Sequence, residues 1–327
     1  MLGGIGLLLC GCGGGEEVTL LADQLGGGVL CVRAPAPDDV WVAGAAPSAS
    51  EGPTLLHYDG STWTALDTSA WAGGELWWVH PMADEIVAVG HEGLLLHGPP
   101  EGPLAGVDGP TAETTFFGVW GASADDVWAV GTVDDDEPHA VAWRRQGGDW
   151  TEVDLSGLTL GDSLFKVHGT AADDVWLVGS DGVALHWDGT ALTATDTGHP
   201  TALLLTVDAG ADPVLAVGGT GSALLLEWDG QAWSDVTPAF QPAYNGVCTG
   251  AGAAWVVGRT GARAERVDGS WITDQDRELQ PAIRDDWHSC AIDSDGGLWM
   301  VGGRIGSRPL IDGVIGYQGP AEPPTWP

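Results

Sequence analysis

A short apolar segment that ends in glycine occurs seven times along this chain of 327 residues. The first copy reads DDVWVAG and the fourth reads DDVWLVG. The seven terminal glycines are Gly44, Gly90, Gly131, Gly179, Gly218, Gly258 and Gly302. Successive glycines are separated by 39 to 48 residues. A repeat of this length is typical of solenoids, propellers and arrays, in which each unit is one small supersecondary structure.

Most copies are followed by a second apolar run that ends in Asp-Gly, as in LLHYDGSTW at 55–63 and ALHWDGTAL at 184–192. Asp-Gly between apolar residues predicts a β-hairpin with a two-residue turn, because both turn positions need a positive φ. A further apolar run precedes each glycine-ending segment, for example FKVHGT at 165–170. Each repeat therefore supplies four strands. Gly, Pro or Asp-Gly interrupts almost every window long enough for a helix.

Four strands in a repeat of about 43 residues predict the blade of a β-propeller. The strand that ends in glycine is apolar at nearly every position, which is expected when each blade is covered by its two neighbours. Five tryptophans occupy one equivalent position of that strand, and we assign them to the core between blades: Trp41, Trp128, Trp176, Trp255 and Trp299. The sequence thus predicts an all-β, seven-bladed β-propeller with four-stranded blades.

The second and third repeats depart from this pattern. After 94–98 the second repeat lacks the Asp-Gly turn, so its outer strand is expected to be irregular. The third repeat has the longer stretch 144–149 in place of the turn.

The two ends of the chain supply the parts of one blade. The seventh repeat contains only three strand-like runs, around Cys290, Trp299 and 314–317, whereas 16–24 resembles the outer strand of other repeats. We expect 18–21 to pair with 314–317 and close the ring, which removes an open sheet edge. These limits define a propeller of 18–319 and a proline-rich tail of 320–327.

The first twelve residues read MLGGIGLLLCGC and are too few to span a bilayer as a helix. The run from Leu9 to Cys12 resembles the lipobox of bacterial lipoproteins and implies acylation at Cys12, with Cys10 as the weaker alternative. A signal peptide of 1–12 and a flexible tether of 13–17 follow from that resemblance. The expected location is the cell envelope or cell surface, lipid-anchored in the outer membrane, or else secreted. No Lys or Arg precedes the apolar run, and an apolar disordered tail is the alternative interpretation.

Charge restricts the partners. The chain has 46 acidic and 11 basic residues and a formal net charge of −35, so it repels nucleic acid and anionic head groups. Membrane attachment is therefore expected only through the lipid, and a monomer is expected. No cofactor is expected. Calcium at the acidic loop 134–137 is an alternative to a solvated loop, although the loop lacks the pattern of a known calcium motif.

Three cysteines remain after export: Cys31, Cys248 and Cys290, each on an expected innermost strand. Adjacent inner strands are often too far apart for a disulfide, so buried thiols are the expected state. No CxxC spacing or histidine partner supports a zinc site, and no metal ligands are assigned.

One position of the inner strands differs in chemistry from repeat to repeat while the surrounding frame recurs. It holds Cys248 in the sixth repeat, and our ligand-binding candidates elsewhere are Arg33, His80, Trp120, His168 and Asp208. A ligand-facing ring at the channel mouth would vary in this way. The simpler alternative is that these side chains fill or hydrate the channel. A second recurring set, His57, His97 and His186, precedes the hairpin turn and is assigned a structural role.

The repeat VWGASADDVWAVG, followed by a hairpin such as LHWDGTAL, resembles the tryptophan-rich propeller repeats of myxobacterial surface lipoproteins. These are grouped loosely with BNR or Asp-box propellers and with Ycf48-like photosystem II assembly factors. The resemblance covers 27–319. It implies the fold and says little about activity. Our first hypothesis is a non-enzymatic surface protein that binds a protein or glycan or serves as a display scaffold.

The alternative function is a carbohydrate-active enzyme, sialidase-like or lyase-like, with a site at the channel mouth. Sialidases use a tyrosine nucleophile and an arginine cluster. Tyr244 is the candidate nucleophile, but the nearby Arg259, Arg263 and Arg266 all lie in one repeat, so no catalytic residue is assigned.

Overall fold

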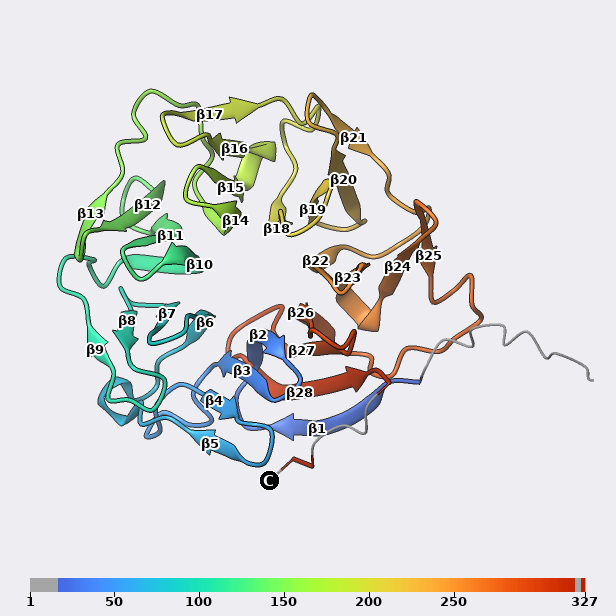
Figure 1. The fold of residues 1–327 in the computed structure, drawn as a ribbon, viewed down its shortest axis with the longest axis horizontal. Helices are drawn as coiled ribbons and strands as arrows, with labels where there is room; N and C mark the ends of the chain where they lie inside the picture. The colour runs from blue at the N-terminus through green and yellow to red at the C-terminus, as the bar shows by residue number, and fades with distance from the viewer. Residues whose placement is uncertain (1–16, 321–324, 327) are drawn as a thin grey trace, which may run out of the picture.

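The computed structural model describes residues 17–320 and 325–326. They form seven four-stranded antiparallel sheets arranged as blades in a ring, which confirms the predicted seven-bladed β-propeller (Figure 1). The expected signal peptide, the acylation site Cys12 and nearly all of the tether 13–17 lie outside the described residues.

Blades 1 to 6 are each built from four consecutive strands that run from the innermost to the outermost. Blade 1 contains β2 (Val29–Ala36), β3 (Asp39–Gly44), β4 (Leu55–Tyr58) and β5 (Trp63–Ala65). Blade 2 contains β6 (Leu76–Pro81), β7 (Ile86–Gly90), β8 (Leu95–Gly98) and β9 (Ala105–Gly106). Blade 3 contains β10 (Thr114–Ser123), β11 (Asp126–Val133), β12 (His139–Gln146) and β13 (Asp149–Glu152).

The next three blades repeat the same order. Blade 4 contains β14 (Leu164–Ala171), β15 (Asp174–Gly179), β16 (Ala184–Trp187) and β17 (Leu192–Thr195). Blade 5 contains β18 (Leu204–Asp208), β19 (Val214–Gly218), β20 (Leu224–Trp228) and β21 (Trp233–Asp235). Blade 6 contains β22 (Tyr244–Gly250), β23 (Ala253–Gly258), β24 (Arg263–Val267) and β25 (Ser270–Thr273).

Blade 7 combines both ends of the chain. Its inner three strands are β26 (Asp286–Ile292), β27 (Leu298–Arg304) and β28 (Ile311–Gln318), and its outer strand is β1 (Thr19–Leu25). β1 runs antiparallel to β28, with Thr19 opposite Tyr317 and Leu20 opposite Gly316. The two strands lie side by side in Figure 1.

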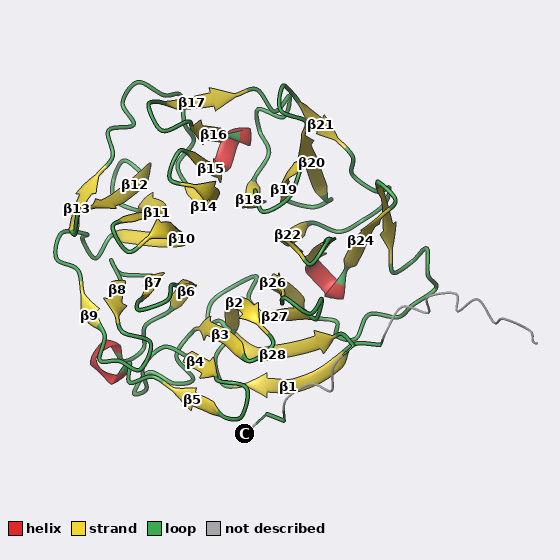
Figure 2. Ribbon diagram, in the orientation of Figure 1, coloured by secondary structure: helices red, strands yellow, loops and turns green. Residues whose placement is uncertain are grey.

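Helical structure is confined to three single turns in the described part of the chain (Figure 2). They are the 3₁₀ turns η1 (Ser69–Trp71), η2 (Ser180–Gly182) and η3 (Arg259–Gly261). No helix among these residues is long and apolar enough to cross a membrane.

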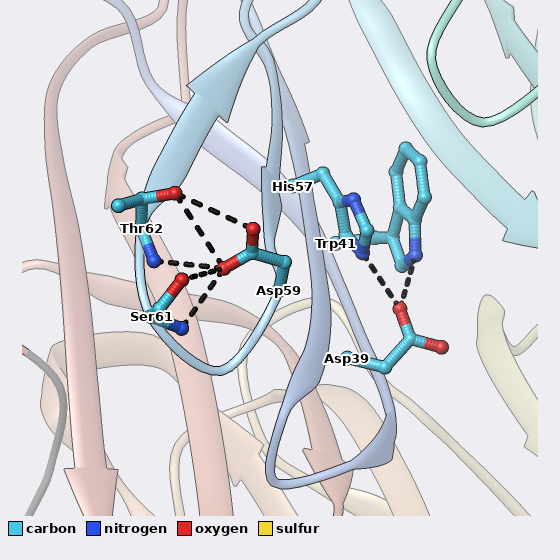
Figure 3. A network of polar contacts seen from close by, with 6 residues as sticks. All are labelled: Asp39, Trp41, His57, Asp59, Ser61 and Thr62. Carbon is cyan, nitrogen blue, oxygen red and sulfur yellow. Dashed lines mark hydrogen bonds and ion pairs between the residues drawn. The ribbon is translucent and has the colours of Figure 1, made fainter.

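The predicted inter-blade core is present. The glycine-ending strands are buried along their length, and the five equivalent tryptophans are between 1% and 6% exposed. In blade 1 the Asp39 carboxylate accepts hydrogen bonds from the Trp41 indole at 2.8 Å and from His57 at 2.9 Å (Figure 3). His57 thus joins β4 to the first residue of β3, which agrees with a structural role.

The expectation of two-residue Asp-Gly turns is wrong for three hairpins. Tyr58 pairs with Trp63, so the loop of blade 1 has four residues, and of its Asp-Gly pair only Gly60 has a positive φ. The reason is the Asp59 side chain, whose Oδ1 accepts the backbone N–H groups of Ser61 and Thr62 at 2.9 and 2.8 Å (Figure 3). Blades 4 and 5 repeat this loop at Asp188 and Asp229.

Two-residue turns occur in blades 6 and 3, and in blade 6 the expected Asp-Gly turn is confirmed. Asp268 and Gly269 both have positive φ between the paired residues Val267 and Ser270. In blade 3 the predicted longer stretch is a turn of Gly147 and Gly148, both with positive φ.

The expectation of buried thiols holds for Cys31 and is wrong for the other two cysteines. Cys248 on β22 and Cys290 on β26 form a disulfide with a Cα–Cα distance of 5.7 Å. The close approach of these strands depends on Gly246, where an added Cβ would lie 2.9 Å from the His288 carbonyl oxygen. A disulfide between neighbouring blades is therefore accommodated at this point of the ring.

Candidate functional site

All seven inner strands carry a β-bulge at an equivalent position, directly after a buried residue near the start of the strand. The residues that interrupt the register are Leu30, Trp77, Phe117, Phe165, Leu205, Asn245 and His288. A bulge re-aims its side chain and is common next to functional sites. The Trp77 ring contacts Phe117 at 5.1 Å and His288 at 5.6 Å between centroids. Trp77 and His288 belong to blades that are not adjacent, so this contact takes place inside the central channel.

The five predicted ligand-binding residues lie three positions further along their strands, and we call this row the channel belt: Arg33, His80, Trp120, His168 and Asp208. Neighbouring belt residues contact one another across blades. The Trp120 ring lies 6.2 Å from His80 and 6.3 Å from His168 between centroids. His168 Nδ1 lies 3.7 Å from the nearer carboxylate oxygen of Asp208.

Belt residues also bond to the next blade. His80 Nε2–H donates to the Gly121 carbonyl at 3.0 Å, and His168 Nδ1 accepts the Ala209 N–H at 3.0 Å. Asp208 accepts the Thr249 hydroxyl at 2.8 Å and the Thr249 N–H at 3.0 Å. The belt therefore joins neighbouring inner strands as well as lining the channel.

Three of the five belt candidates line one cavity of about 360 Å³, which we call the mouth pocket. It lies where the inner strands end and turn outward. Its polar lining includes Arg33, His168, Asp208, Thr249, Asp293 and Ser294. His80 and Trp120 are buried at 9% and 7% exposure and are not part of this lining. The candidates thus divide into a pocket group and a packing group.

Burial holds the belt histidines neutral at pH 7. It lowers the pKa of His80 to about 3, with a smaller contribution from the positive charge of Arg33. It also lowers the pKa of His168, against the attraction of the Asp208 carboxylate. The mouth pocket therefore contains one permanent cation, Arg33, beside a neutral imidazole.

Sequence reasoning missed Lys166, the one lysine of the chain. Its Nζ donates to the Phe117 carbonyl at 3.1 Å and lies 3.2 Å from the centroid of the Trp78 ring. Lys166 belongs to blade 4 and Trp78 to blade 2, so the side chain reaches across the channel. Burial lowers the pKa of its ammonium to about 7. Its place two residues before His168 on the same strand is the signal that would have found it.

The residues considered for a sialidase-like site are not at the channel. Tyr244 is fully buried in the core between blades 5 and 6, and burial raises the pKa of its phenol. Arg263 and Arg266 are paired with Asp274 and Glu227, and Arg259 donates to the Thr220 carbonyl. These side chains do not converge on one anion.

Known proteins resemble this chain in fold. Streptogramin B lyase superimposes with a TM-score of 0.70 at 10% identity, over 93% of this chain and 97% of that one. YCF48 bound to a D1 peptide gives 0.64 at 13% identity, over 93% and 97%. The WD40 β-propeller domain of Doa1 gives 0.62 at 14% identity, over 92% and 97%. The chain has the β-propeller fold. At these identities the likeness concerns the fold alone.

No family model matches the sequence, and no curated protein matches it. A shared fold does not fix the function, which depends on the residues of the site.

Proposed function

We propose that this chain is an exported, lipid-anchored surface propeller that binds a segment of another protein at the mouth pocket and catalyses no reaction. The observation that carries the proposal is the contrast between the belt and its frame. The seven blades repeat their core, whereas Arg33, His168 and Asp208 bring different chemistry from three blades to one cavity. A pocket built from non-equivalent side chains on equivalent strands suits recognition of one asymmetric ligand.

A neighbour in fold supports a peptide ligand. YCF48 carries a D1 peptide in its solved structure, at a TM-score of 0.64. The fold can thus present a peptide-binding surface, and the mouth pocket is our candidate for that surface here. A glycan is the alternative ligand class, and the binding experiment compares the two.

Two features support export. The Cys248–Cys290 disulfide is of a kind that persists in oxidising compartments and is rare in the cytosol. The net charge of −35 suits a soluble domain held at a membrane only by lipid. The resemblance of 9–12 to a lipobox supplies the anchor, in the manner of myxobacterial surface lipoproteins.

The burial of Tyr244, the candidate nucleophile, argues against the enzyme alternative. Tyr244 is 0% exposed, so its phenol oxygen cannot reach a substrate at the channel mouth. A hydrolase with a tyrosine nucleophile would need that contact.

Binding is tested with the fragment 13–327 on arrays of defined peptides and glycans. The proposal expects a peptide whose binding is weakened at least tenfold by His168→Ala and is unchanged by His139→Ala, which alters an exposed histidine. Binding that survives His168→Ala, binding of glycans alone, or turnover of sialosides would overturn it.

Export is tested by fractionating bacterial cells that express the full chain. The wild type is expected in the membrane fraction with a lipid-modified Cys12, and Cys12→Ser is expected to leave that fraction. Equal distribution of the two proteins would overturn the anchor.

A further inference from the structure

Arg33 lines the mouth pocket, and its guanidinium has no hydrogen-bond or ion-pair partner among the described residues. Seven of the other nine arginines pair with acids, among them Arg144 with Asp126, Arg145 with Glu85 and Arg266 with Glu227. Of the remaining two, Arg259 donates to the Thr220 carbonyl and Arg284 is exposed in a loop away from the pocket lining. The chain has 46 acidic and 11 basic residues. With acids in such excess, an arginine that faces a pocket without an acceptor points to an acceptor on the ligand.

His168 offers a second donor at the same pocket. Its Nδ1 accepts the backbone N–H of Ala209 at 3.0 Å. A neutral imidazole with an accepting Nδ1 carries its proton on Nε2. In the described part of the chain no acceptor is hydrogen-bonded to Nε2. The ring therefore has one N–H available to a ligand, next to the unmatched guanidinium.

The two carboxylates of the pocket are already held by protein donors. Asp208 accepts the N–H groups of Gly210 and Thr249 and the Thr249 hydroxyl. Asp293 accepts the N–H of Gly297 at 2.8 Å and the indole N–H of Trp299 at 3.0 Å. Neither forms an ion pair with Arg33 at 4 Å or less. The side-chain donors of the lining that remain available are those of Arg33 and His168 and the Ser294 hydroxyl, and only Arg33 is charged.

We propose that the mouth pocket recognises a carboxylate, held by the Arg33 guanidinium through paired hydrogen bonds and by the Nε2–H of His168. A planar guanidinium binds a carboxylate through two parallel N–H···O bonds, which fixes its orientation as well as its charge. The carboxylate comes from the end of a peptide chain or from an Asp or Glu side chain. That the carboxylate belongs to a peptide rests on the proposed function, whereas the carboxylate site itself does not.

The test uses isothermal titration calorimetry on the fragment 13–327 at constant ionic strength. The probes are sodium acetate, a short neutral peptide with a free C-terminus, the same peptide with a C-terminal amide, and an amidated peptide with one internal glutamate. Sodium chloride serves as the non-carboxylate anion. The two peptide carboxylates distinguish a chain end from an acidic side chain.

The decisive variant is Arg33→Gln, and its matched control is Arg284→Gln, which changes an exposed loop arginine. Arg33 makes no hydrogen bond to a described residue, so the variant is expected to fold. A thermal melt equal to that of the wild type verifies this. As a second readout, the ¹⁵N signals of labelled His168 are followed during the acetate titration.

We expect saturable binding of acetate and of at least one peptide carboxylate, a loss of at least tenfold in affinity in Arg33→Gln, no loss in Arg284→Gln, and a shifted His168 signal. Acetate binding without any peptide binding supports the carboxylate site and overturns the proposed peptide function. A neutral amidated peptide that binds wild type and Arg33→Gln alike supports peptide binding and overturns the carboxylate site. Equal responses to acetate and chloride also overturn it.

Discussion

The imidazole of His57 lies against the indole of Trp41, with ring centroids 4.0 Å apart and ring planes inclined by 13° (Figure 3). Blade 4 repeats the arrangement, with His186 and Trp176 at 4.3 Å and 21°. In both blades an aspartate at the start of the second strand bonds to the histidine. A contact that recurs in separate blades stabilises the blade itself and does not mark a ligand site.

Replacing His57 by alanine should destabilise the propeller. The change removes the stack and the hydrogen bond to Asp39, which together are worth about 1 to 2 kcal/mol. A fall of about 2 to 4 °C in melting temperature per kcal/mol is expected for a domain of this size. Thermal unfolding followed by circular dichroism measures it. His139→Ala is the control, and equal melting of the two variants would contradict the structural role.

Glycine at the inner strands allows blades 6 and 7 to approach. A Cβ at Gly246 would lie 2.9 Å from the His288 carbonyl oxygen and 3.1 Å from the Ser289 Cα. Gly246→Ala should therefore cost about 1 to 3 kcal/mol in unfolding free energy, because backbone atoms must move. Gly157→Ala is the matched control, since a Cβ there meets nothing within 4 Å. A melting temperature no lower than that of the control would contradict the close approach.

The blades could be predicted from the sequence because their signals are local and recur seven times. Loop geometry could not, because the Asp59 side chain competes with the turn backbone for the same N–H groups. The disulfide was missed for another reason. The distance between Cys248 and Cys290 depends on how closely two inner strands pack, and no spacing along the chain reports this.

The sequence predicted five ligand-binding residues at one position of the inner strands, and three of them line the mouth pocket. The register placed Arg33, His168 and Asp208 at one level of the channel, where the structure also has them. It did not distinguish them from His80 and Trp120, which pack within the belt. The contact of Lys166 with Trp78 depends on the length of the lysine side chain and on the relative positions of blades 4 and 2. The pattern of residues along a strand does not reveal these positions.

The disulfide gives a simple thiol count. The fragment 13–327 contains Cys31, Cys248 and Cys290. Alkylation in denaturant without reductant should label Cys31 alone, and labelling after reduction should reach all three. Mass spectrometry of the peptides measures this. Native labelling should be slow, because burial raises the pKa of the Cys31 thiol to about 11. Labelling of Cys248 before reduction would contradict the bond.

Removing β1 should weaken the ring. A fragment that begins at residue 26 leaves the outer edge of β28 unpaired, whereas one that begins at residue 17 keeps the pairing of Thr19 with Tyr317. An open edge is prone to pair with other chains. The shorter fragment should melt at a lower temperature and form larger species in size-exclusion chromatography with light scattering. Two monodisperse fragments with one melting temperature would contradict the importance of this pairing.

Buried neutral histidine should make stability depend on pH. Burial lowers the folded-state pKa of His80 to about 3, from an ordinary value near 6.5. Between these values the unfolded chain binds a proton that the folded protein does not, so the free energy of unfolding falls as pH drops below about 6.5. One such group contributes up to about 1.4 kcal/mol per pH unit. His80→Asn should therefore lose less stability than the wild type between pH 7 and pH 5, by up to about 2 kcal/mol.

Urea unfolding at the two pH values measures the difference. The variant keeps His168 and His288, whose pKa values burial also lowers, so part of the pH dependence should remain. The substitution also alters the hydrogen bond to the Gly121 carbonyl, which changes the free energy of unfolding of the variant at both pH values. The loss of stability between pH 7 and pH 5 is therefore compared within each protein. An identical loss of stability in the two proteins would contradict a lowered pKa of His80 in the folded state, and the channel would then carry a charged His80 in addition to Arg33 and Lys166 near pH 6.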